Sequence, residues 1–166
     1  MIAAREGRTG PARLVLTSPA FQEGGPVPVR HTCDGDDVSP VLTWTGVPVE
    51  TRGFVLICDD PDAPRGTWVH WLLYNLPAEA TGLEEAVPTL PELPSGGRQG
   101  INDAGDVGYG GPCPPPGKPH RYFFRLHALD TLLTLPPGVH RPELDRAMAG
   151  HILARGTLMG TYQRHG

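Results

Sequence analysis

The stretch Trp68-Val69-His70-Trp71-Leu72-Leu73-Tyr74-Asn75-Leu76 decides the fold. In a β-strand, successive side chains point to opposite faces of the sheet. Both alternating sets are largely apolar here, which predicts a strand that is covered on both faces. One of the sets also carries His70, a polar side chain between Trp68 and Trp71. The stretch therefore predicts an interior strand that ends near a polar site.

Other short apolar or β-branched runs, bounded by Pro, Gly and Asp, predict further strands. They lie at 14–17, 41–44, 53–58, 120–129 and 157–162. One segment, 142–153, has apolar residues at helical spacing with Pro142 near its start, and a weaker helical pattern lies at 81–85. The 22 glycines and 20 prolines punctuate the strand-like runs, so the pattern is typical of a loop-rich β protein.

Length and charge narrow the class of protein. The 166 residues predict a single domain, for which we expect residues 14–164 after an N-terminal extension at 1–13. A net charge of −4 argues against a nucleic-acid partner or an anionic lipid surface, and no apolar run reaches the roughly 18 residues of a membrane span. The first eleven residues lack the apolar core of a secretory signal. Three cysteines suggest a reducing compartment, so we expect a cytoplasmic protein.

The segment 88–119 is a long Gly- and Pro-rich connection without a clear strand. Loops of this length inside a compact domain are usually functional or disordered. The sequences Gly100-Ile101-Asn102-Asp103 and Tyr109-Gly110-Gly111-Pro112 are typical of shaped backbone. We therefore expect this segment to contribute to a functional site.

Polar side chains gather against aromatic ones at two places. Asp60 and Asp62 follow the strand at 53–58 on a turn stiffened by prolines, and His70 comes eight residues after Asp62. A second proline-rich turn leads into His120 and Tyr122. Since eight of the 11 aromatic residues lie in or beside these segments, the pattern favours an aromatic-walled cavity.

Each of these residues also has a plain structural interpretation. The two aspartates could bond nearby backbone N–H groups in a turn, and His70 could be a hydrogen-bonded core residue. Arg121 is most simply half of an ion pair with a nearby acid. The nucleophile, phosphate-loop, dinucleotide and zinc motifs that we searched for are missing from the sequence, and we expect no metal and no cofactor.

The residues quoted above resemble the two signature regions of the phosphatidylethanolamine-binding protein family, in order and at similar spacing. They are Asp60-Pro61-Asp62-Ala63-Pro64, Trp68-x-His70, Gly111-Pro112 and His120-Arg121-Tyr122, with supporting matches at 32–40, Trp44 and 150–162. The sequence looks most like the bacterial Raf-kinase-inhibitor-like branch. The resemblance implies a mostly β fold with a large antiparallel central sheet, a smaller second sheet and one or two peripheral helices.

The resemblance also implies a small pocket for phosphate-like anions or phospholipid head groups. Its ligand-binding residues would be Asp60, His70, Tyr109, Gly111, Pro112, His120 and Tyr122, with Asp62, Pro64 and Trp68 as supporting wall. Members of the family are mostly binders and regulators. The chain ends without the C-terminal helix of eukaryotic members and has Cys113 after Pro112, so we do not carry over kinase regulation.

A phosphate group in such a pocket needs hydrogen-bond donors, and His70 and His120 could donate as cations. The N–H groups of Gly110 and Gly111 could add to them, while Asp60 orients a histidine or receives an ammonium group. Two alternatives stay open: a module that recognises phosphorylated or acidic partner proteins, and a small-ester hydrolase that uses Asp60, His70 and His120.

Three further features are left open by the sequence. The protein could form a homodimer. An oxidised pair of Cys33 and Cys113 is an alternative to free thiols, because both lie in loops that could approach the site. The peptide bond between Ala63 and Pro64 could be cis or trans.

Overall fold

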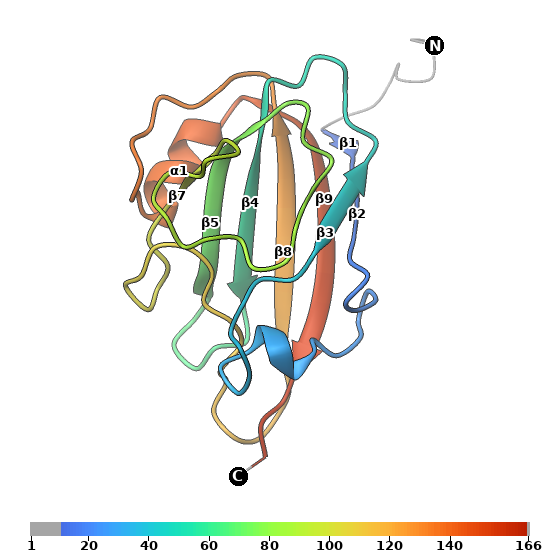
Figure 1. Cartoon of the computed structure of the whole chain (residues 1–166), viewed down its shortest axis with the longest axis vertical. Helices are drawn as coiled ribbons and strands as arrows, with labels where there is room; N and C mark the ends of the chain where they lie inside the picture. Colours follow the sequence, from blue (N-terminus) through green and yellow to red (C-terminus); the bar gives the residue numbers. More distant parts are fainter. Residues whose placement is uncertain (1–10, 166) are drawn as a thin grey trace.

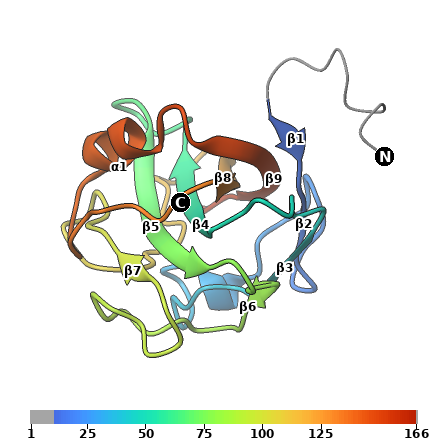
Figure 2. The same ribbon diagram turned by 90° about the horizontal axis from the view of Figure 1, so that it is seen from above.

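A six-stranded sheet forms the centre of the protein, with a three-stranded sheet on one face and a helix on the other (Figures 1 and 2). The computed structural model describes residues 11–165. The large sheet has the order β1 (Ala12–Arg13), β9 (Ile152–Tyr162), β8 (His120–Leu129), β4 (Gly53–Asp60), β5 (Trp68–Pro77) and β7 (Arg98–Gln99). The small sheet has the order β2 (Val15–Thr17), β3 (Leu42–Thr45) and β6 (Gly82–Leu83). Helix α1 spans Arg141–Met148, and a single 3-10 turn spans Val29–His31.

Strand β4 shows why the large sheet is buried on both faces. All eight of its residues are buried. Phe54 and Leu56 belong to a core cluster with Trp44 of the small sheet, whereas Val55 and Ile57 pack in a second cluster that includes residues of α1. The alternation follows the period of two of a strand. β5 is buried in the same way, which confirms the prediction made from residues 68–76.

The large sheet is mixed rather than purely antiparallel. β1 pairs parallel with β9, with Ala12 opposite Ala154, while the other neighbours in this sheet are antiparallel. β1 and β9 come from opposite ends of the chain, so no hairpin fixes their relative direction. Because Ala12 and Arg13 form a strand, the last residues of the expected N-terminal extension belong to the sheet; residues 1–10 lie outside the described residues.

The helical predictions need correction. α1 ends at Met148 instead of continuing to residue 153, because Gly150 adopts a φ of +83° and β9 begins at Ile152. The predicted helix at 81–85 is wrong: Gly82 and Leu83 form β6, where Gly82 lies so close to the Leu42 carbonyl oxygen that a Cβ would be 2.4 Å from it. Within residues 11–165, no helix is long and apolar enough to cross a membrane.

Candidate functional site

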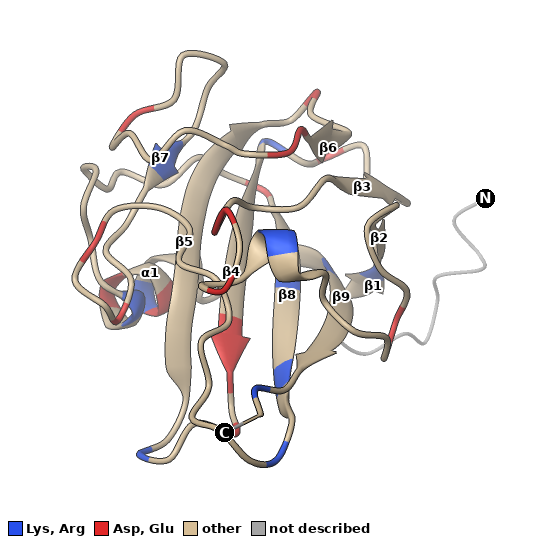
Figure 3. Ribbon diagram, turned by 60° about the horizontal axis from the view of Figure 1, so that its bottom comes forward, with Lys and Arg blue, Asp and Glu red and all other residues tan. Residues whose placement is uncertain are grey.

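A cavity of about 400 Å³ lies at the end of the sheet where β4 ends and where β5 and β8 begin. Figure 3 shows this end of the molecule turned forward, with the acidic end of β4 in red. The cavity is lined by Cys33, Asp37, Asp60, Ala63, Pro64, Trp68, Val69, His70, Asn102, Ala104, Asp106, Tyr109, Gly110, Gly111, Cys113, Pro114, Pro115, His120 and Tyr122. The structure thus brings both sequence segments that carry the predicted site residues to one place.

Asp60 and His120 form a hydrogen-bonded pair in this cavity. Asp60 is buried at the end of β4, and its Oδ2 atom accepts a hydrogen bond from His120 Nδ1 at 2.7 Å. Its other oxygen, Oδ1, accepts the backbone N–H of Asp62 at 2.7 Å. Both interpretations of Asp60 are therefore realised, since it shapes the turn and also contacts a histidine. Because its two oxygens are both engaged, the geometry favours orientation of His120 over capture of an ammonium group.

His70 is oriented from the other side of the cavity. The pairing of β4 and β5 shifts between Cys58, opposite Trp71, and Asp59, opposite Val69, so His70 has no residue opposite it. Such irregularities change the direction of a side chain. Nδ1 of His70 donates to the Gly110 carbonyl oxygen at 2.7 Å. Burial lowers the pKa of His70 in spite of this hydrogen bond and the nearby Asp60, so the imidazole favours its neutral form.

Tyr122 lies between the two imidazoles. Its ring centroid is 5.3 Å from that of His70, edge to face, and 6.4 Å from that of His120, nearly stacked. The side chain is 1% exposed, and its hydroxyl has no hydrogen-bond partner within residues 11–165. Burial, followed by the charge of Asp60, raises the pKa of Tyr122. A buried hydroxyl without a partner is costly, and a ligand in the cavity could supply that partner.

The charged residues of the lining are acidic. Asp37, Asp60 and Asp106 line the cavity, and the lining contains neither Lys nor Arg. Apart from the imidazoles, no side chain of residues 11–165 that lines the site carries positive charge. An anion finds a positive charge here only if an imidazole is protonated or if the ligand brings its own proton or cation.

The expectation that the turn at Gly110 and Gly111 offers free N–H groups is wrong. The N–H of Gly110 donates to the backbone carbonyl oxygen of His70 at 2.9 Å, and the N–H of Gly111 donates to Asp37 Oδ1 at 2.7 Å. A Cβ at Gly111 would lie 2.2 Å from the His31 carbonyl oxygen, so glycine is required there by close packing. This turn builds the wall of the cavity and leaves anion binding to side chains.

Two predicted residues lie outside the lining. The Pro112 carbonyl oxygen accepts the N–H of Cys33, and the ring is not among the groups that line the cavity. Asp62 instead forms a two-pronged ion pair with Arg121, which lowers the pKa of Asp62 to about 2. The prediction of an ion pair for Arg121 is confirmed. The other predicted residues, including Trp68 and Pro64, do line the cavity, and their role in binding stays a prediction.

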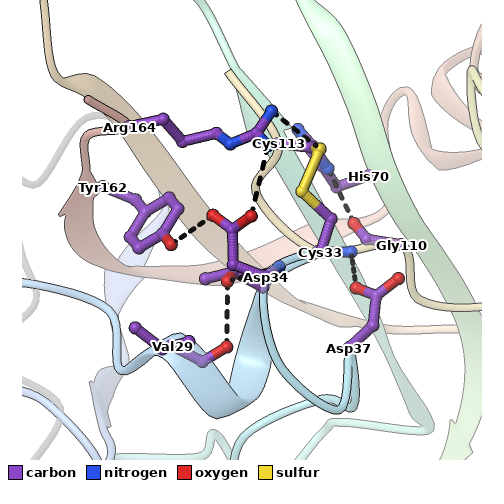
Figure 4. Close-up of a disulfide and its surroundings, with 11 residues drawn as sticks. Val29, Cys33, Asp34, Asp37, His70, Gly110, Cys113, Tyr162 and Arg164 are labelled. Carbon is purple, nitrogen blue, oxygen red and sulfur yellow. Dashed lines mark hydrogen bonds and ion pairs between the residues drawn. A yellow bond between two sulfur atoms is a disulfide. The ribbon is translucent and has the colours of Figure 1, made fainter. Parts of the chain in front are cut away.

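The structure pairs Cys33 with Cys113 in a disulfide (Figure 4). Cys58 is free and buried. Of the two alternatives that the sequence left open for Cys33 and Cys113, the structure therefore has the oxidised pair. The bonded residues are 80 positions apart in sequence, with Cα atoms 5.4 Å apart. The two loops that carry these cysteines are distant in sequence and become neighbours only in the folded chain. The peptide bond between Ala63 and Pro64 is trans, because the described residues contain no cis bond.

The segment 88–119 contributes to the cavity as expected, but Asn102, Ala104 and Asp106 were not among the predicted site residues. Asn102 organises the loop after β7: its Nδ2 donates to the Gly108 carbonyl oxygen, and its Oδ1 accepts the N–H groups of Ala104 and Asp106. The Asn-Asp-Ala-Gly-Asp run is typical of side-chain-stabilised turns, and that signal could have placed Asp106 beside a functional site. Asp37, at a φ of +59°, carried no comparable local signal.

Comparison with known proteins gives consistent results. Residues 17–163 match the family model described as phosphatidylethanolamine-binding protein. A UPF0098 protein from Methanothermobacter thermautotrophicus is 53% identical over 90% of this chain and 98% of its own length, and one from Aquifex aeolicus is 49% identical over 93% and 91%. Similar relatives thus occur in both archaea and bacteria. None of these names states an enzymatic activity.

Solved structures agree with the fold. The crystal structure of a phosphatidylethanolamine-binding protein homologue from Chlamydia trachomatis has a TM-score of 0.84 at 41% identity and covers 92% of this chain and 98% of that one. YbcL of E. coli, described as a new member of the mammalian PEBP family, has a TM-score of 0.85 at 34% identity, with coverage of 92% and 99%. The chain therefore belongs to the phosphatidylethanolamine-binding protein family.

Proposed function

We propose that the cavity binds the phosphate group of a small phosphomonoester or of a phospholipid head group, and that the protein is a binding protein with a regulatory role. The observation that carries the proposal is the arrangement of the two imidazoles around Tyr122. In each ring Nδ1 is used by a protein acceptor. The Nε2 atoms therefore remain for a ligand, together with the hydroxyl of Tyr122, for which residues 11–165 provide no hydrogen-bond partner.

Binding of an anion at these atoms requires protons. With Nδ1 carrying the hydrogen that it donates, a neutral imidazole has only an acceptor at Nε2. A bound phosphate oxygen needs a donor at that position, so His70 or His120 must take up a proton or the phosphate must bring one. Because burial lowers the pKa of His70, the unliganded site loses its positive charge as the pH rises. Anion affinity should therefore increase as the pH falls.

Calorimetric titration with sulfate at pH 5.5 and pH 8 tests this account, since sulfate keeps its charge of −2 over the range. We expect about tenfold tighter binding at pH 5.5. Inorganic phosphate should follow the same trend, with proton uptake visible as a dependence of the binding heat on the buffer. Equal affinities at the two pH values, or tighter binding at pH 8, would refute the protonated-imidazole account.

The acidic lining favours a ligand that also carries a cation. Asp106 is exposed at the cavity and belongs to the hydrogen-bonded turn that Asn102 organises. An ammonium group linked to the phosphate could bind to it, which would favour phosphoethanolamine over methyl phosphate. Asp106→Asn should remove that preference and leave methyl phosphate binding unchanged, whereas Glu84→Gln at a site outside the lining should alter neither.

The hydrolase alternative has little support in the geometry. Asp60, His120 and His70 could perform acid–base work, but the described part of the chain contributes no serine or threonine to the lining, and the two cysteines there are bonded to each other. Attack by water would be the remaining route. Turnover of a phosphate or carboxylate ester that disappears in His120→Gln would establish the enzyme instead.

One observation supports a larger ligand or a protein partner. Trp68 is 43% exposed where it lines the cavity, beside Pro64 and Pro115, which are also exposed. An apolar rim of this kind suits an acyl chain or the residues around a phosphorylated side chain. Binding of phosphatidylethanolamine vesicles and of a phosphoserine peptide, each tested for displacement by inorganic phosphate, distinguishes these two sources of a phosphate group.

The cytoplasmic location and the homodimer remain predictions.

A further inference from the structure

The disulfide between Cys33 and Cys113 lies at the cavity itself. Both cysteines are among the lining residues, and both are exposed. Figure 4 shows the bond between the loop that follows the 3-10 turn and the loop after Gly110, with His70 nearby. A disulfide in a closed core resists reductants, whereas an exposed one is open to attack by a thiolate.

Hydrogen bonds join the same two loops independently of the sulfur atoms. Tyr109 Oη donates to the His31 carbonyl oxygen at 2.7 Å, the N–H of Gly111 donates to Asp37 at 2.7 Å, and the N–H of Cys33 donates to Pro112 at 3.1 Å. Tyr109 is buried. Cleavage of the disulfide would therefore leave the base of the contact in place and release only its exposed end.

The exposed end leads directly to a proposed ligand-binding residue. Cys113 begins the proline-rich loop that ends at His120, and this loop contributes Pro114 and Pro115 to the lining. Besides the disulfide, the C-terminal segment holds the loop through hydrogen bonds between Gly117 and Arg164 and between Gln163 and Gly117. The disulfide is thus the covalent anchor at the start of a loop whose far end positions His120.

The charges around the two sulfur atoms differ. Arg164 Nη1 lies 3.7 Å from Cys113 Sγ, and Nη2 of the same guanidinium pairs with Asp34 at 3.2 Å. Asp34 is next to Cys33 in sequence and also accepts a hydrogen bond from Tyr162 at 2.6 Å. A guanidinium stabilises a thiolate, whereas a carboxylate disfavours one. Attack on Cys33 with release of Cys113 as the leaving thiolate is therefore the favoured direction of cleavage.

We propose that the Cys33–Cys113 disulfide is a reversible redox control on the cavity, opened by a dithiol reductant. One thiolate of the reductant attacks Cys33 Sγ and forms a mixed disulfide, with Cys113 leaving as a thiolate. The second thiol of the reductant displaces Cys33 and closes the reductant's own disulfide. Two electrons and two protons pass to the protein, which then carries two cysteine thiols.

The reduced protein keeps its sheets but holds its ligand less well. Without the covalent anchor, the loop from Cys113 to Pro119 gains freedom, and ordering it again on binding costs free energy. This consequence rests on the proposed function, because it assumes that phosphate occupies the cavity. In a reducing cytoplasm the loose form would prevail, and oxidation would raise the affinity.

Hydrogen exchange followed by mass spectrometry tests the redox step without any ligand. On reduction with dithiothreitol, we expect faster exchange in 113–119 and unchanged exchange in β4, β5 and β8, with full reversal on reoxidation. The Cys33→Ser/Cys113→Ser variant should show the same exchange rates as the reduced protein, with or without dithiothreitol. A bond that cannot be reduced in the folded protein, or reduction that accelerates exchange throughout the sheet, would identify a structural crosslink and overturn the proposal.

Calorimetry with inorganic phosphate tests the consequence for binding. Reduction should weaken binding about tenfold, and the double serine variant should bind like the reduced form. Equal affinities in the two redox states would overturn the control of the cavity. If phosphate binds neither form, the proposed function fails, and the exchange experiment still decides whether the loop is released by reduction.

Replacement of the guanidinium tests the direction of cleavage. Arg164→Gln should slow reduction by dithiothreitol several-fold, because the leaving thiolate of Cys113 loses its cation. Arg146→Gln, with the same change of charge on α1, is the matched control and should leave the rate unchanged. Equal rates for the wild type and Arg164→Gln would overturn the assignment of Cys113 as the leaving group.

Discussion

Asp59 and Asp60 are neighbours at the end of β4 and are both buried, yet they serve opposite sides of the sheet. On the α1 side, Asp59 receives hydrogen bonds from two guanidinium groups, those of Arg125 and Arg141. On the cavity side, Asp60 contacts one imidazole and one backbone N–H. The period of two of the strand separates the two carboxylates.

The two sides of the sheet differ in how far the charges of their carboxylates are neutralised by neighbouring cations. The carboxylate of Asp59 is matched by permanent cations, so its environment is complete without a ligand. The cavity side has three carboxylates, two titratable rings and a buried hydroxyl without a partner. Complete compensation stabilises the fold, whereas incomplete compensation leaves groups that a ligand can satisfy. The two sides should therefore respond differently to substitution.

Loss of Asp59 should have the largest effect on stability. Asp59→Ala leaves two guanidinium groups facing each other without their carboxylate, and we expect a decrease of about 3 to 4 kcal/mol in the free energy of unfolding, measured in urea. Phosphate affinity should not change. Asp145→Ala is the matched control, because Asp145 pairs with the same Arg141 at the surface and should cost less than about 0.5 kcal/mol. Equal losses in the two variants would contradict the comparison.

The α1 side also contains a histidine that resists protonation. Burial, with the cations of Arg155 and Arg141 as further contributors, lowers the pKa of His127 to about 4. The unfolded chain, with a pKa near 6.5, binds this proton more readily, so stability is lost as the pH falls from 6.5 to 4. Between pH 7.5 and 4.5 the loss should be about 2 kcal/mol smaller in His127→Gln than in the wild type.

Urea unfolding over that pH range measures the difference. His151→Gln, at an exposed pair with Asp130, serves as the control and should retain the wild-type slope. A slope that is the same in His127→Gln and in the wild type would show that His127 accepts its proton freely in the folded protein.

The cavity side should respond in binding rather than in stability. His120→Gln removes the imidazole that Asp60 orients, and we expect about tenfold weaker binding of inorganic phosphate at pH 5.5, equivalent to about 1.4 kcal/mol. The free energy of unfolding should change by less than about 1 kcal/mol. His127→Gln, on the other side of the sheet, should bind phosphate like the wild type. An affinity unchanged in His120→Gln would remove this ring from the site.

Much of this architecture follows from local pattern. The apolar patterns of 68–76 and 120–129 predicted two strands of the central sheet, because burial on a sheet follows the period of two. Simple alternation did not predict which residues of 68–76 share a face, since the pairing of β4 and β5 shifts twice and Leu76 packs in the same cluster as Trp71 and Leu73. Along 120–129 the alternation is regular as far as Ala128. The same alternation carries His120 and Tyr122 to the cavity. The helix end was misplaced because His151 and Ile152 continue the apolar stripe by chance, although Gly150 stops the helix.

The features that the sequence did not predict depend on contacts between loops that are far apart in sequence. The disulfide joins residues 80 positions apart, and neither cysteine has a spacing that specifies the other. Asp37 occupies the N–H of Gly111, which the sequence offered as a free donor. Local periodicity contains no information on such pairings, because they are set by how the loops pack once the sheets have formed. The family resemblance implied that a cavity exists. The hydrogen-bond partners and charges of its residues became known only from the structure.

The smallest effect is expected for Asp62. This residue lies on the turn beside the cavity, but its carboxylate, like that of Asp59, is paired with a guanidinium group. It receives two hydrogen bonds from the guanidinium of Arg121 and one from its backbone N–H, and both side chains are partly exposed. Asp62→Asn should lower the free energy of unfolding by about 0.5 to 1 kcal/mol at pH 7. Since the pKa of Asp62 lies at about 2, below its ordinary value of 3.8, this contribution is present above pH 3.8 and fades as the pH falls toward 2. Wild type and variant should therefore approach each other in urea unfolding as the pH falls from 3.8 toward 2, with unchanged sulfate affinity at pH 5.5. Weaker sulfate binding in Asp62→Asn would move this carboxylate into the site.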